Sequence, residues 1–401
     1  MNNHIARPPH NAGMMLETPF HPRISAANSV QSWYDWKGYI SPERFEQVDF
    51  EYFAIRNTTA VFDLCPMTKY LIEGPDAEAF LNRLFTRDVR KIREGRVGYG
   101  IWCDDAGQVQ DDGTLFHVSK GRYRLCSQER CLDWLHWSAL DFDVSITEET
   151  ASVAALAVQG PTSCATLRAM GLAGIETLKP FELRHYPFQG GELMVSRTGF
   201  TGDLGYEVWT STELALALWD ALFAAGEPYL IRPIGTTALN IARIEAGFIM
   251  AGIDFVPAEQ TIRHGRSRSP LELGLDWLVD FEKGQFTGRR ALLEERARGS
   301  RYRFVRLDVD GNKPAVNSFI FGAGQREVVG TVTSAVWCPT AKCNVAMASL
   351  DMPHGQPGEE LWAEIYSMRE LKWTRSMARA RVLEKPVFEP ARRRQTPAPM
   401  F

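Results

Sequence analysis

The feature that most constrains the fold is a repeated unit: a short apolar strand, a Gly-Pro turn and a helix. The unit first occurs at Tyr70–Ile72, where Gly74-Pro75 separates a strand from a helix expected over Ala77–Leu84. It returns at Val153–Val158, which is followed by Gly160-Pro161 and a second helix. Apolar residues at strand and helix spacing, separated by Gly and Pro, mark such elements. Two units predict two related α/β subdomains.

The rest of the chain divides into further elements. Between the two units, turns at Asp104–Gly107 and Lys120-Gly121 separate strand-like runs and predict a β-meander. Helices are expected over Thr210–Gly226, which begins with capping-box spacing, and from Thr236 to about Ile249. After about residue 300 the helical patterns almost vanish and short strands alternate with Gly, Pro and Asp. That composition is typical of a separate small antiparallel barrel.

Composition excludes several classes of protein. The 401 residues suffice for two or three domains, and the net charge of -4 gives no electrostatic reason to expect nucleic acid. No apolar run is long enough to span a bilayer, and the first residues lack the apolar core of a signal peptide. Seven scattered cysteines fit reduced thiols. We therefore expect a cytoplasmic protein that binds neither nucleic acid nor membrane.

The stretch "SRTGFTGDLGYEVW", residues 196–209, has three glycines at every third position followed by the acid Glu207. A dinucleotide fingerprint needs G-x-G-x-x-G between a strand and a helix, and a phosphate loop needs Gly-Lys-Ser/Thr, so neither motif fits. Gly199 and Gly202 can take positive φ and let another group approach the main chain closely. The spacing alone leaves two readings open, a turn and a ligand-binding loop.

A second acidic feature is Asp111-Asp112, within the predicted meander. Adjacent strand residues point to opposite faces, so at most one of these acids faces a given pocket, and a solvated strand end is the other reading. The cysteine pairs are spaced five apart, and no His-x-x-x-His occurs. Because zinc sites favour Cys-x-x-Cys and related spacings, we expect no metal.

Taken together, these segments resemble the glycine-cleavage T-protein family of tetrahydrofolate-dependent aminomethyltransferases and demethylases. The resemblance runs from about Phe62 to Phe388 and rests on nine motifs in the same order: "FDLCPM", "IEGPDAEAFLNRL", "GYGIWCDDAGQVQDD", "AVQGP", "SRTGFTGDLGYEV", "ARIEAG", "SPLELGLDWLV", "FTGRRAL" and "GTVTSAVWCPT". Each motif alone is weak, and nine in register are strong.

The resemblance implies an α+β fold, a ring of two interleaved α/β subdomains around a folate channel with a C-terminal antiparallel β-barrel. The resemblance also implies how the chain divides: an N-terminal arm over residues 1–30, a folate- and substrate-binding domain over 31–295, the barrel over 300–388 and a tail over 389–401. The basic run in that tail is expected to be solvated.

The family's folate site maps onto named residues of this chain. The second acid of the family's D-D motif lies near the reacting nitrogens of folate, and Asp112 occupies that position. The acid that grips the amino-pyrimidine edge of the pteridine corresponds to Glu207, and a carboxylate can accept two parallel N–H bonds from such an edge. The remaining folate-binding positions correspond to Tyr99, Phe116, Phe200, Phe248, Met67 and Arg243.

The chain departs from T-proteins on the other side of the pocket. Leu239-Asn240 replaces an Arg-Asp pair, Cys65-Pro66-Met67 replaces Ser-His-Met, and the segment "VPAEQTIRHGRSR" is longer. These changes argue against a lipoyl carrier protein and favour a free small methylated substrate, as in the demethylase branch that acts on sulfonium compounds such as DMSP or on methoxylated aromatics.

The leading hypothesis is a tetrahydrofolate-dependent methyltransferase that moves a methyl group from a small donor to N5 of tetrahydrofolate. A sulfonium donor leaves neutral, whereas an ether oxygen gains from a positioned acid, by about 10²–10⁴-fold. The aromatic lead-in "SWYDWKGY" favours a methoxylated aromatic acid as donor. Candidates for a substrate-side acid or anion clamp are Tyr34, Tyr39, Arg263 and His264, which match no family motif and for which surface roles are the alternative.

Three alternatives stay open. One is sulfonium demethylation, and another is aminomethyl or N-methyl chemistry that yields 5,10-methylenetetrahydrofolate. The third is a non-catalytic folate-binding protein that assists iron–sulfur assembly. That branch carries K-G-C-Y-x-G, whereas this chain has Lys283-Gly284-Gln285-Phe286-Thr287-Gly288 and lacks the cysteine.

Overall fold

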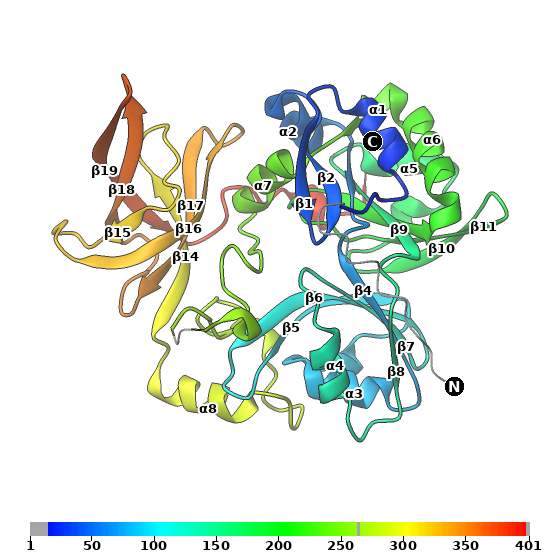
Figure 1. Cartoon of the computed structure of the whole chain (residues 1–401), viewed down its shortest axis with the longest axis horizontal. Coiled ribbons are helices and arrows are strands. Elements are labelled where there is room, and N and C mark those ends of the chain that lie inside the picture. Colours follow the sequence, from blue (N-terminus) through cyan, green and yellow to red (C-terminus); the bar gives the residue numbers. More distant parts are fainter. Residues whose placement is uncertain (1–14, 263–264, 398–401) are drawn as a thin grey trace.

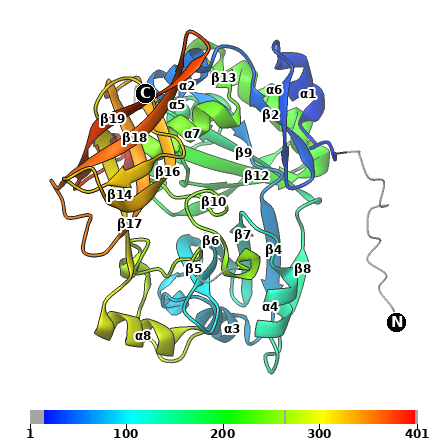
Figure 2. The same ribbon diagram turned by 60° about the vertical axis from the view of Figure 1, so that its left-hand side comes forward.

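A computed structural model describes residues 15–262 and 265–397. It contains two mixed α/β bodies, each built on one sheet, and a closed barrel (Figure 1). The barrel lies beside the sheets in both views, and the two sheets lie one above the other (Figure 2). The α+β fold and the separate C-terminal antiparallel barrel predicted from the sequence are thus confirmed.

The first sheet has six strands in the order β10-β11-β12-β9-β3-β13 and is antiparallel apart from the β3–β13 pair. Its strands are β3 (Ala60–Asp63), β9 (Val153–Gln159), β10 (Leu183–Phe188), β11 (Gly191–Ser196), β12 (Gly205–Ser211) and β13 (Arg232–Pro233). The second sheet has the order β5-β6-β7-β4-β8, with β4 (Thr68–Glu73), β5 (Arg96–Cys103), β6 (Val109–Ser119), β7 (Arg122–Ser127) and β8 (Ser145–Glu148). The chain leaves the first sheet after β3 and returns at β9, so the two subdomains are interleaved.

The barrel closes in the order β14-β17-β16-β15-β18-β19, because β14 pairs with both β17 and β19. Its strands are β14 (Tyr302–Val309), β15 (Phe319–Phe321), β16 (Val328–Cys338), β17 (Cys343–Asp351), β18 (Glu360–Arg369) and β19 (Lys372–Leu383). Closure leaves the sheet without free edges.

The helices are α1 (His21–Ala27), α2 (Val48–Asn57), α3 (Ala77–Leu84), α4 (Leu132–Ser138), α5 (Ser163–Ala169), α6 (Ala215–Gly226), α7 (Thr236–Glu245) and α8 (Arg289–Arg298). A separate hairpin consists of β1 (Ser32–Trp36) and β2 (Tyr39–Arg44). Short 3-10 turns lie at Val89–Lys91, Ile175–Thr177, Thr212–Leu214, Glu227–Tyr229, Ala258–Gln260, Asp276–Leu278 and Ala391–Arg393. No helix in the described ranges is long and apolar enough to cross a membrane.

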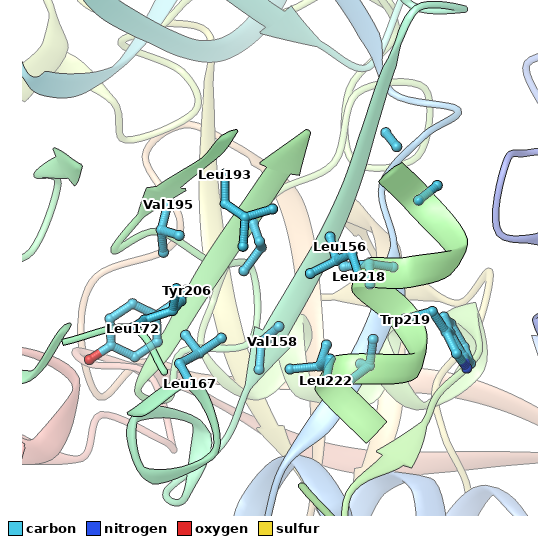
Figure 3. Packing of buried hydrophobic residues seen from close by; sticks show 14 of the residues in the cluster. Leu156, Val158, Leu167, Leu172, Leu193, Val195, Tyr206, Leu218, Trp219 and Leu222 are labelled. Carbon is cyan, nitrogen blue, oxygen red and sulfur yellow. The ribbon is translucent and has the colours of Figure 1, made fainter. Parts of the chain in front are cut away.

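Apolar side chains fill both faces of the first sheet. On one face, Figure 3 shows Leu156 and Val158 of β9 packed with residues of β11, β12, α5 and α6, including Leu218 and Leu222. The opposite face shares a core with the second sheet, in which Phe62 and Trp209 meet Phe116 and Cys126. The two sheets are therefore joined through a common apolar layer, which is where the candidate site lies.

Two predicted helix ends differ from the structure. The helix expected from Thr210 begins only at Ala215 after a 3-10 turn, and the Thr210 hydroxyl donates to the Glu192 carbonyl instead of capping it. The second helix ends at Glu245, before Ile249, because Gly247 turns the chain at φ +71°.

The chain ends that the structure describes are packed. Phe20 and Ile24 are buried in the core of the first sheet, and the Thr18 hydroxyl donates to Asp63, so residues 18–24 of the expected N-terminal arm are packed against this sheet. In the tail, Arg392 forms a two-bond ion pair with Asp203 at 2.6 and 2.7 Å. The expectation of a solvated basic run is wrong for this arginine.

Candidate functional site

Asp112 lies on β6, on the face that looks toward the first sheet. Its Oδ2 accepts a hydrogen bond from the Tyr99 hydroxyl on β5 at 2.7 Å. Burial raises the pKa of Asp112 to about 6, the Tyr99 bond opposes that rise, and the nearby Asp254 charge adds to it. A carboxyl that titrates near neutral pH can hold or release a proton under working conditions.

Asp111 has a different role. Its side chain is fully buried on the other face of β6, and its two oxygens accept backbone N–H groups from Asp112 at 2.9 Å and Glu129 at 2.8 Å. The strand alternation thus separates the two acids as the sequence indicated. Asp111 fixes the backbone around Asp112, and only Asp112 faces the space between the sheets.

Glu207 lies on β12, between Ala157 of β9 and Ser196 of β11. Its Oε2 is buried and has no hydrogen-bond partner among the described residues. Burial raises the pKa of Glu207 to about 7, and the hydroxyls of Thr198 and Ser196, then the Lys69 charge, oppose that rise. A buried acceptor without a partner is costly for the protein alone, so this oxygen is available to a donor from a ligand.

The three glycines before Glu207 shape its loop. Only Gly202 has positive φ, at +75°, and a Cβ there would lie 2.4 Å from Ala246 Cβ. A Cβ on Gly199 or Gly205 would lie 2.1 or 2.2 Å from Gln159 Oε1. Positive φ is therefore not the reason for Gly199. The Gln159 amide needs that space because its Nε2 donates to the carbonyls of Thr198 and Tyr206.

Aromatic residues lie beside these acids. The rings of Phe200 and Phe248 stack with centroids 5.6 Å apart and planes 24° apart. Phe200 and Met67 are partly exposed at the edge of the shared apolar core, so a flat ligand can contact them. Phe116 is fully buried and packs edge-on against Trp209 at 5.2 Å, so its direct surroundings are protein side chains.

Arg243 is buried, and protein groups use its donors. Its guanidinium forms an ion pair with Asp254 and donates to Asn240 Oδ1 at 2.8 Å and to Ser334 Oγ of the barrel at 2.7 Å. It also donates to the carbonyl of Phe248 at 3.1 Å. These bonds tie α7 to the barrel and hold the segment that carries Phe248, so Arg243 shapes the aromatic pair.

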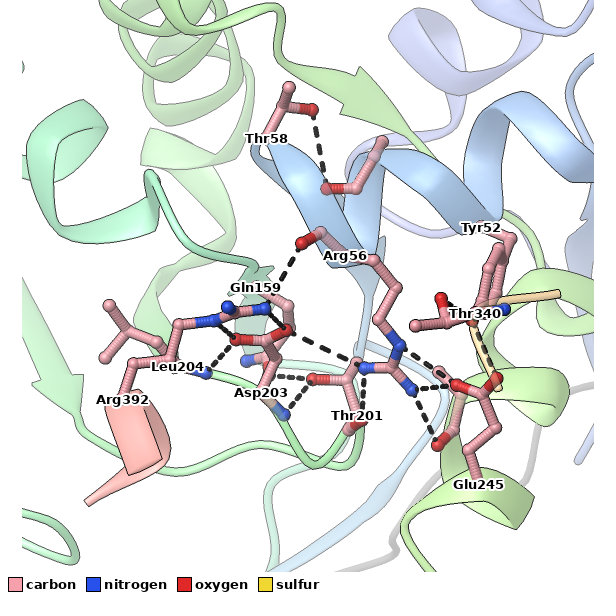
Figure 4. A network of polar contacts seen from close by, with 12 residues as sticks. Tyr52, Arg56, Thr58, Gln159, Thr201, Asp203, Leu204, Glu245, Thr340 and Arg392 are labelled. Atoms are coloured by element: carbon pink, nitrogen blue, oxygen red, sulfur yellow. Dashed lines mark hydrogen bonds and ion pairs between the residues drawn. The ribbon is translucent and has the colours of Figure 1, made fainter. Parts of the chain in front are cut away.

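A buried ion-pair network contacts the loop of residues 197–204, which precedes Glu207 in the chain (Figure 4). Arg56 of α2 pairs with Glu245 of α7 at 2.6 Å and donates to the Thr201 carbonyl at 2.8 Å. Tyr52 donates to the other Glu245 oxygen at 2.7 Å, and Arg392 reaches across to Asp203. All acids in this network have partners, which is the arrangement expected of a structural element.

The predicted substrate-side residues fall into two groups. Tyr34 and Tyr39 lie on the β1–β2 hairpin, and burial raises the pKa of both phenols, with Asp63 close enough to add to each rise. Both phenols therefore lie near Asp63, at the end of β3. Arg263 and His264 lie outside the described residues.

Two side chains at this site belong to no recognisable motif, so the sequence did not predict their roles. Lys69 is fully buried and donates to the carbonyls of Leu64, Cys65 and Met67 at 3.2, 2.8 and 2.7 Å, so it holds the turn next to Glu207. Trp36 packs on Phe62 with ring centroids 5.6 Å apart. Lys69 is the second residue of a strand and Trp36 lies in a hairpin, and neither stands in a residue spacing that would mark it as functional.

Two family models match the chain. The GCVT N-terminal domain covers residues 21–283, and the glycine cleavage T-protein C-terminal barrel domain covers residues 303–388. The chain belongs to the glycine-cleavage T-protein family. Members of this aminomethyltransferase family use tetrahydrofolate as co-substrate, so this T-protein relative is a tetrahydrofolate-dependent one-carbon transferase.

Individual relatives agree with this assignment. An aminomethyltransferase from Caldanaerobacter subterraneus subsp. tengcongensis is 31% identical over 332 residues, which cover 82% of this chain and 86% of the relative. A trimethylamine-oxide aldolase from Ruegeria pomeroyi is 32% identical over 360 residues, which cover 86% of this chain and 44% of the aldolase. The crystal structure of aminomethyltransferase T of the Bartonella henselae glycine cleavage system superimposes with a TM-score of 0.81 at 24% identity, covering 94% and 98% of the two chains, which shows the shared fold.

The side chains present fit tetrahydrofolate. The unpartnered Glu207 Oε2 offers an acceptor to an amino-pyrimidine edge, and the stacked Phe200 and Phe248 offer a flat apolar surface. A folate needs both, because it combines a hydrogen-bonding edge with aromatic rings. Among residues 15–262 and 265–397, no group of three or more His, Cys, Asp or Glu side chains is placed to hold a metal ion.

Proposed function

We propose that this protein transfers a methyl group from a small donor to N5 of tetrahydrofolate and that the donor is a methoxylated aromatic acid. The observation that carries the proposal is Asp112, a partly exposed carboxyl that accepts a hydrogen bond from Tyr99 and whose pKa is raised to about 6. Cleavage of an aryl ether leaves an oxygen that gains from a proton, whereas a sulfonium leaves neutral. An acid that titrates near neutral pH therefore supports the ether chemistry.

Each protein group has a separate task in this proposal. Glu207 binds the amino-pyrimidine edge, and Phe200 and Phe248 contact the flat rings. Tetrahydrofolate supplies the nucleophilic nitrogen. Asp112 gives its proton to the departing oxygen, and the methylated N5 then loses its own proton, which restores the Asp112 carboxyl. The surrounding apolar layer excludes water. Most of the rate gain then comes from alignment of the two reactants, which can supply up to about 7–11 kcal/mol.

We propose Tyr34 and Tyr39 as contacts for the donor, and a free donor in place of a lipoyl carrier. Support comes from position 240, where T-proteins carry the acid of an Arg-Asp pair. Here it is Asn240, whose Oδ1 accepts from the Arg243 Nε at 2.8 Å. The side chain is thus committed to the protein, and the charge that the T-protein acid would supply is absent at this position.

A second candidate is one-carbon transfer from an amine, which yields 5,10-methylenetetrahydrofolate. The names of the relatives favour it, because one acts as an aminomethyltransferase and another on trimethylamine oxide. In that reaction, Asp112 would accept or supply a proton at nitrogen with the same geometry.

The test offers tetrahydrofolate and three donors to the purified protein: a methoxybenzoate, a dimethylsulfonium carboxylate and an N-methyl amino acid. The folate product is identified by mass. 5-Methyltetrahydrofolate from the methoxybenzoate supports the proposal, and the same product only from the sulfonium moves the assignment to that class. A 5,10-methylene product supports the amine route. Binding of folate without turnover of any donor would favour a non-catalytic folate-binding protein.

A further inference from the structure

The β1–β2 hairpin presents one face to the site. Its register places Trp36 opposite Tyr39 and Tyr34 opposite Ser41, so these four side chains share a face. Tyr39 and Ser41 on this face are buried, whereas Asp35 on the other face is exposed. The hairpin therefore has an inner face made largely of aromatic rings.

This inner face covers the turn that follows β3. The Trp36 ring lies against Phe62, and both Trp36 and Met67 are partly exposed at the edge of the apolar core that also contains Phe116. Tyr39 is close enough to the Asp63 carboxylate for its charge to raise the pKa of the phenol further. The hairpin thus lies over the chain segment at Cys65-Pro66, where the sequence departs from T-proteins.

Trp36 carries an unused hydrogen-bond donor. Its Nε1 is buried and has no acceptor within the part of the chain that the structure describes. The Trp102 and Trp209 indoles share this condition but are almost fully buried inside the protein. Trp134 shares it and is partly exposed like Trp36, but it packs against the separate core of the second sheet, whereas Trp36 packs against the core that the two sheets share. A buried N–H without an acceptor costs about 1–3 kcal/mol, and a ligand oxygen would remove that cost.

The tip of the hairpin is tied to the strand that carries Asp112. Lys37 and Gly38 both have positive φ, as in a tight two-residue turn, and the Lys37 ammonium pairs with Glu129. Glu129 also accepts from Gln260 Nε2 at 2.8 Å. The backbone N–H of Glu129 is the one that Asp111 holds, next to Asp112. The Glu129 carboxylate therefore joins the hairpin tip at Lys37 and the segment at Gln260 to its own loop, which lies next to Asp112.

We infer that the inner face of the β1–β2 hairpin is the donor-binding wall of the site, with Trp36 donating its indole N–H to an acceptor oxygen of the methyl donor. The Lys37–Glu129 pair positions this wall against the strand that carries Asp112. This inference rests on the proposed function. It assigns the donor as a flat molecule whose methylated group lies beside a hydrogen-bond acceptor, the class to which methoxylated aromatic acids belong.

The first test is Trp36→Phe, which keeps an aromatic ring and removes the N–H. We expect the KM for the turned-over donor to rise about tenfold, which corresponds to about 1.4 kcal/mol for one lost hydrogen bond, with the KM for tetrahydrofolate unchanged. Trp337→Phe on the barrel is the matched control. A donor KM within twofold of the wild-type value for Trp36→Phe would overturn the assignment of Trp36.

The second test is a charge exchange. Lys37→Glu and Glu129→Lys should each raise the donor KM and speed hydrogen exchange in residues 32–44, and the double variant should restore both. Failure of the double variant to restore either quantity, or unchanged exchange in the single variants, would overturn the positioning role. If the wild type turns over none of the three donors, the proposed function fails together with the donor assignment. The exchange measurement still decides whether the pair positions the hairpin.

Discussion

Glu245 and Glu207 are two glutamates near the same loop, and they differ in burial and in hydrogen bonding: Glu245 is fully buried and both its oxygens have partners, whereas Glu207 is partly exposed with a buried Oε2. Glu245 accepts from Tyr52 and from Arg56, with side chains of the Arg56–Glu245 pair only 2% and 0% exposed. Glu207 keeps Oε2 without a partner among the described residues, and burial raises its pKa to about 7. The difference separates a charge that stabilises the fold from one that is available to a ligand.

The largest effect is expected at Asp112, the other acid whose pKa burial raises toward neutral pH. Asp112→Asn removes the proton donor but keeps the size and the acceptor for Tyr99, so we expect turnover to fall by about 10²–10⁴-fold. The dissociation constant for tetrahydrofolate should change little, as measured by fluorescence or calorimetry. Wild-type turnover should fall as pH rises through about 6, because Asp112 loses its proton there. A variant with near-normal turnover would remove Asp112 from the reaction.

The second-largest effect is expected at Glu245, the glutamate whose two oxygens both have protein partners. Glu245→Ala leaves the Arg56 guanidinium buried without its carboxylate, which typically costs about 3–5 kcal/mol of the free energy of unfolding. Chemical denaturation measures this loss. Glu294→Ala, which breaks the exposed Arg290–Glu294 pair on α8, is the control and should leave the unfolding midpoint almost unchanged. Equal midpoints for the two variants would contradict the structural role of Glu245.

Unlike Glu245→Ala, Glu207→Gln should weaken ligand binding without destabilising the fold. Glutamine keeps the size but loses the charge that accepts two N–H bonds, so we expect tetrahydrofolate affinity to fall about 10–100-fold, the range for hydrogen bonds to a charged group. The free energy of unfolding should stay equal or rise, because no protein partner of Oε2 is lost. Unchanged affinity in a titration would show that Glu207 does not bind folate.

The smallest effect concerns pH and stability without ligand. Because the pKa of Glu207 is raised from 4.5 to about 7, the folded protein binds its proton more tightly than the unfolded chain. The free energy of unfolding contributed by this group therefore falls as pH rises from about 4.5 to 7. Wild-type stability should decline across that window relative to Glu207→Gln, in parallel denaturation series. Parallel curves would indicate that the Glu207 pKa is not raised.

Several elements followed directly from the sequence. The helix Ala77–Leu84, the meander of β5 to β7 and the barrel strands have clear periodicity and turn residues, and the structure confirms them. The positions of Asp112 and Glu207 came from motifs in which a strand follows a turn. These signals are local, since each is contained in a stretch of roughly ten to twenty residues.

Other features could not be predicted from local sequence patterns. The basic run after residue 390 has the composition of a solvated tail, yet Arg392 pairs with Asp203, 189 residues earlier in the chain. Arg243 belongs to a family motif, but its contact with Ser334 of the barrel spans 91 residues. Trp36 and Lys69 have no local signal at all. Their roles depend on which segments the fold brings together.

The amino-acid sequence alone is enough to assign the family and the order of the two subdomains and the barrel, and to predict which acids stand at the family's folate positions. Which of the buried charges have partners depends on the three-dimensional fold. The side chains of Arg56, Glu245 and Asp203 find partners that lie from 145 to 193 residues away in the chain, while Glu207 Oε2 and Trp36 Nε1 have no partner among the described residues. Hydrogen-bond saturation depends on distances between segments far apart in the chain, and no local pattern encodes those distances.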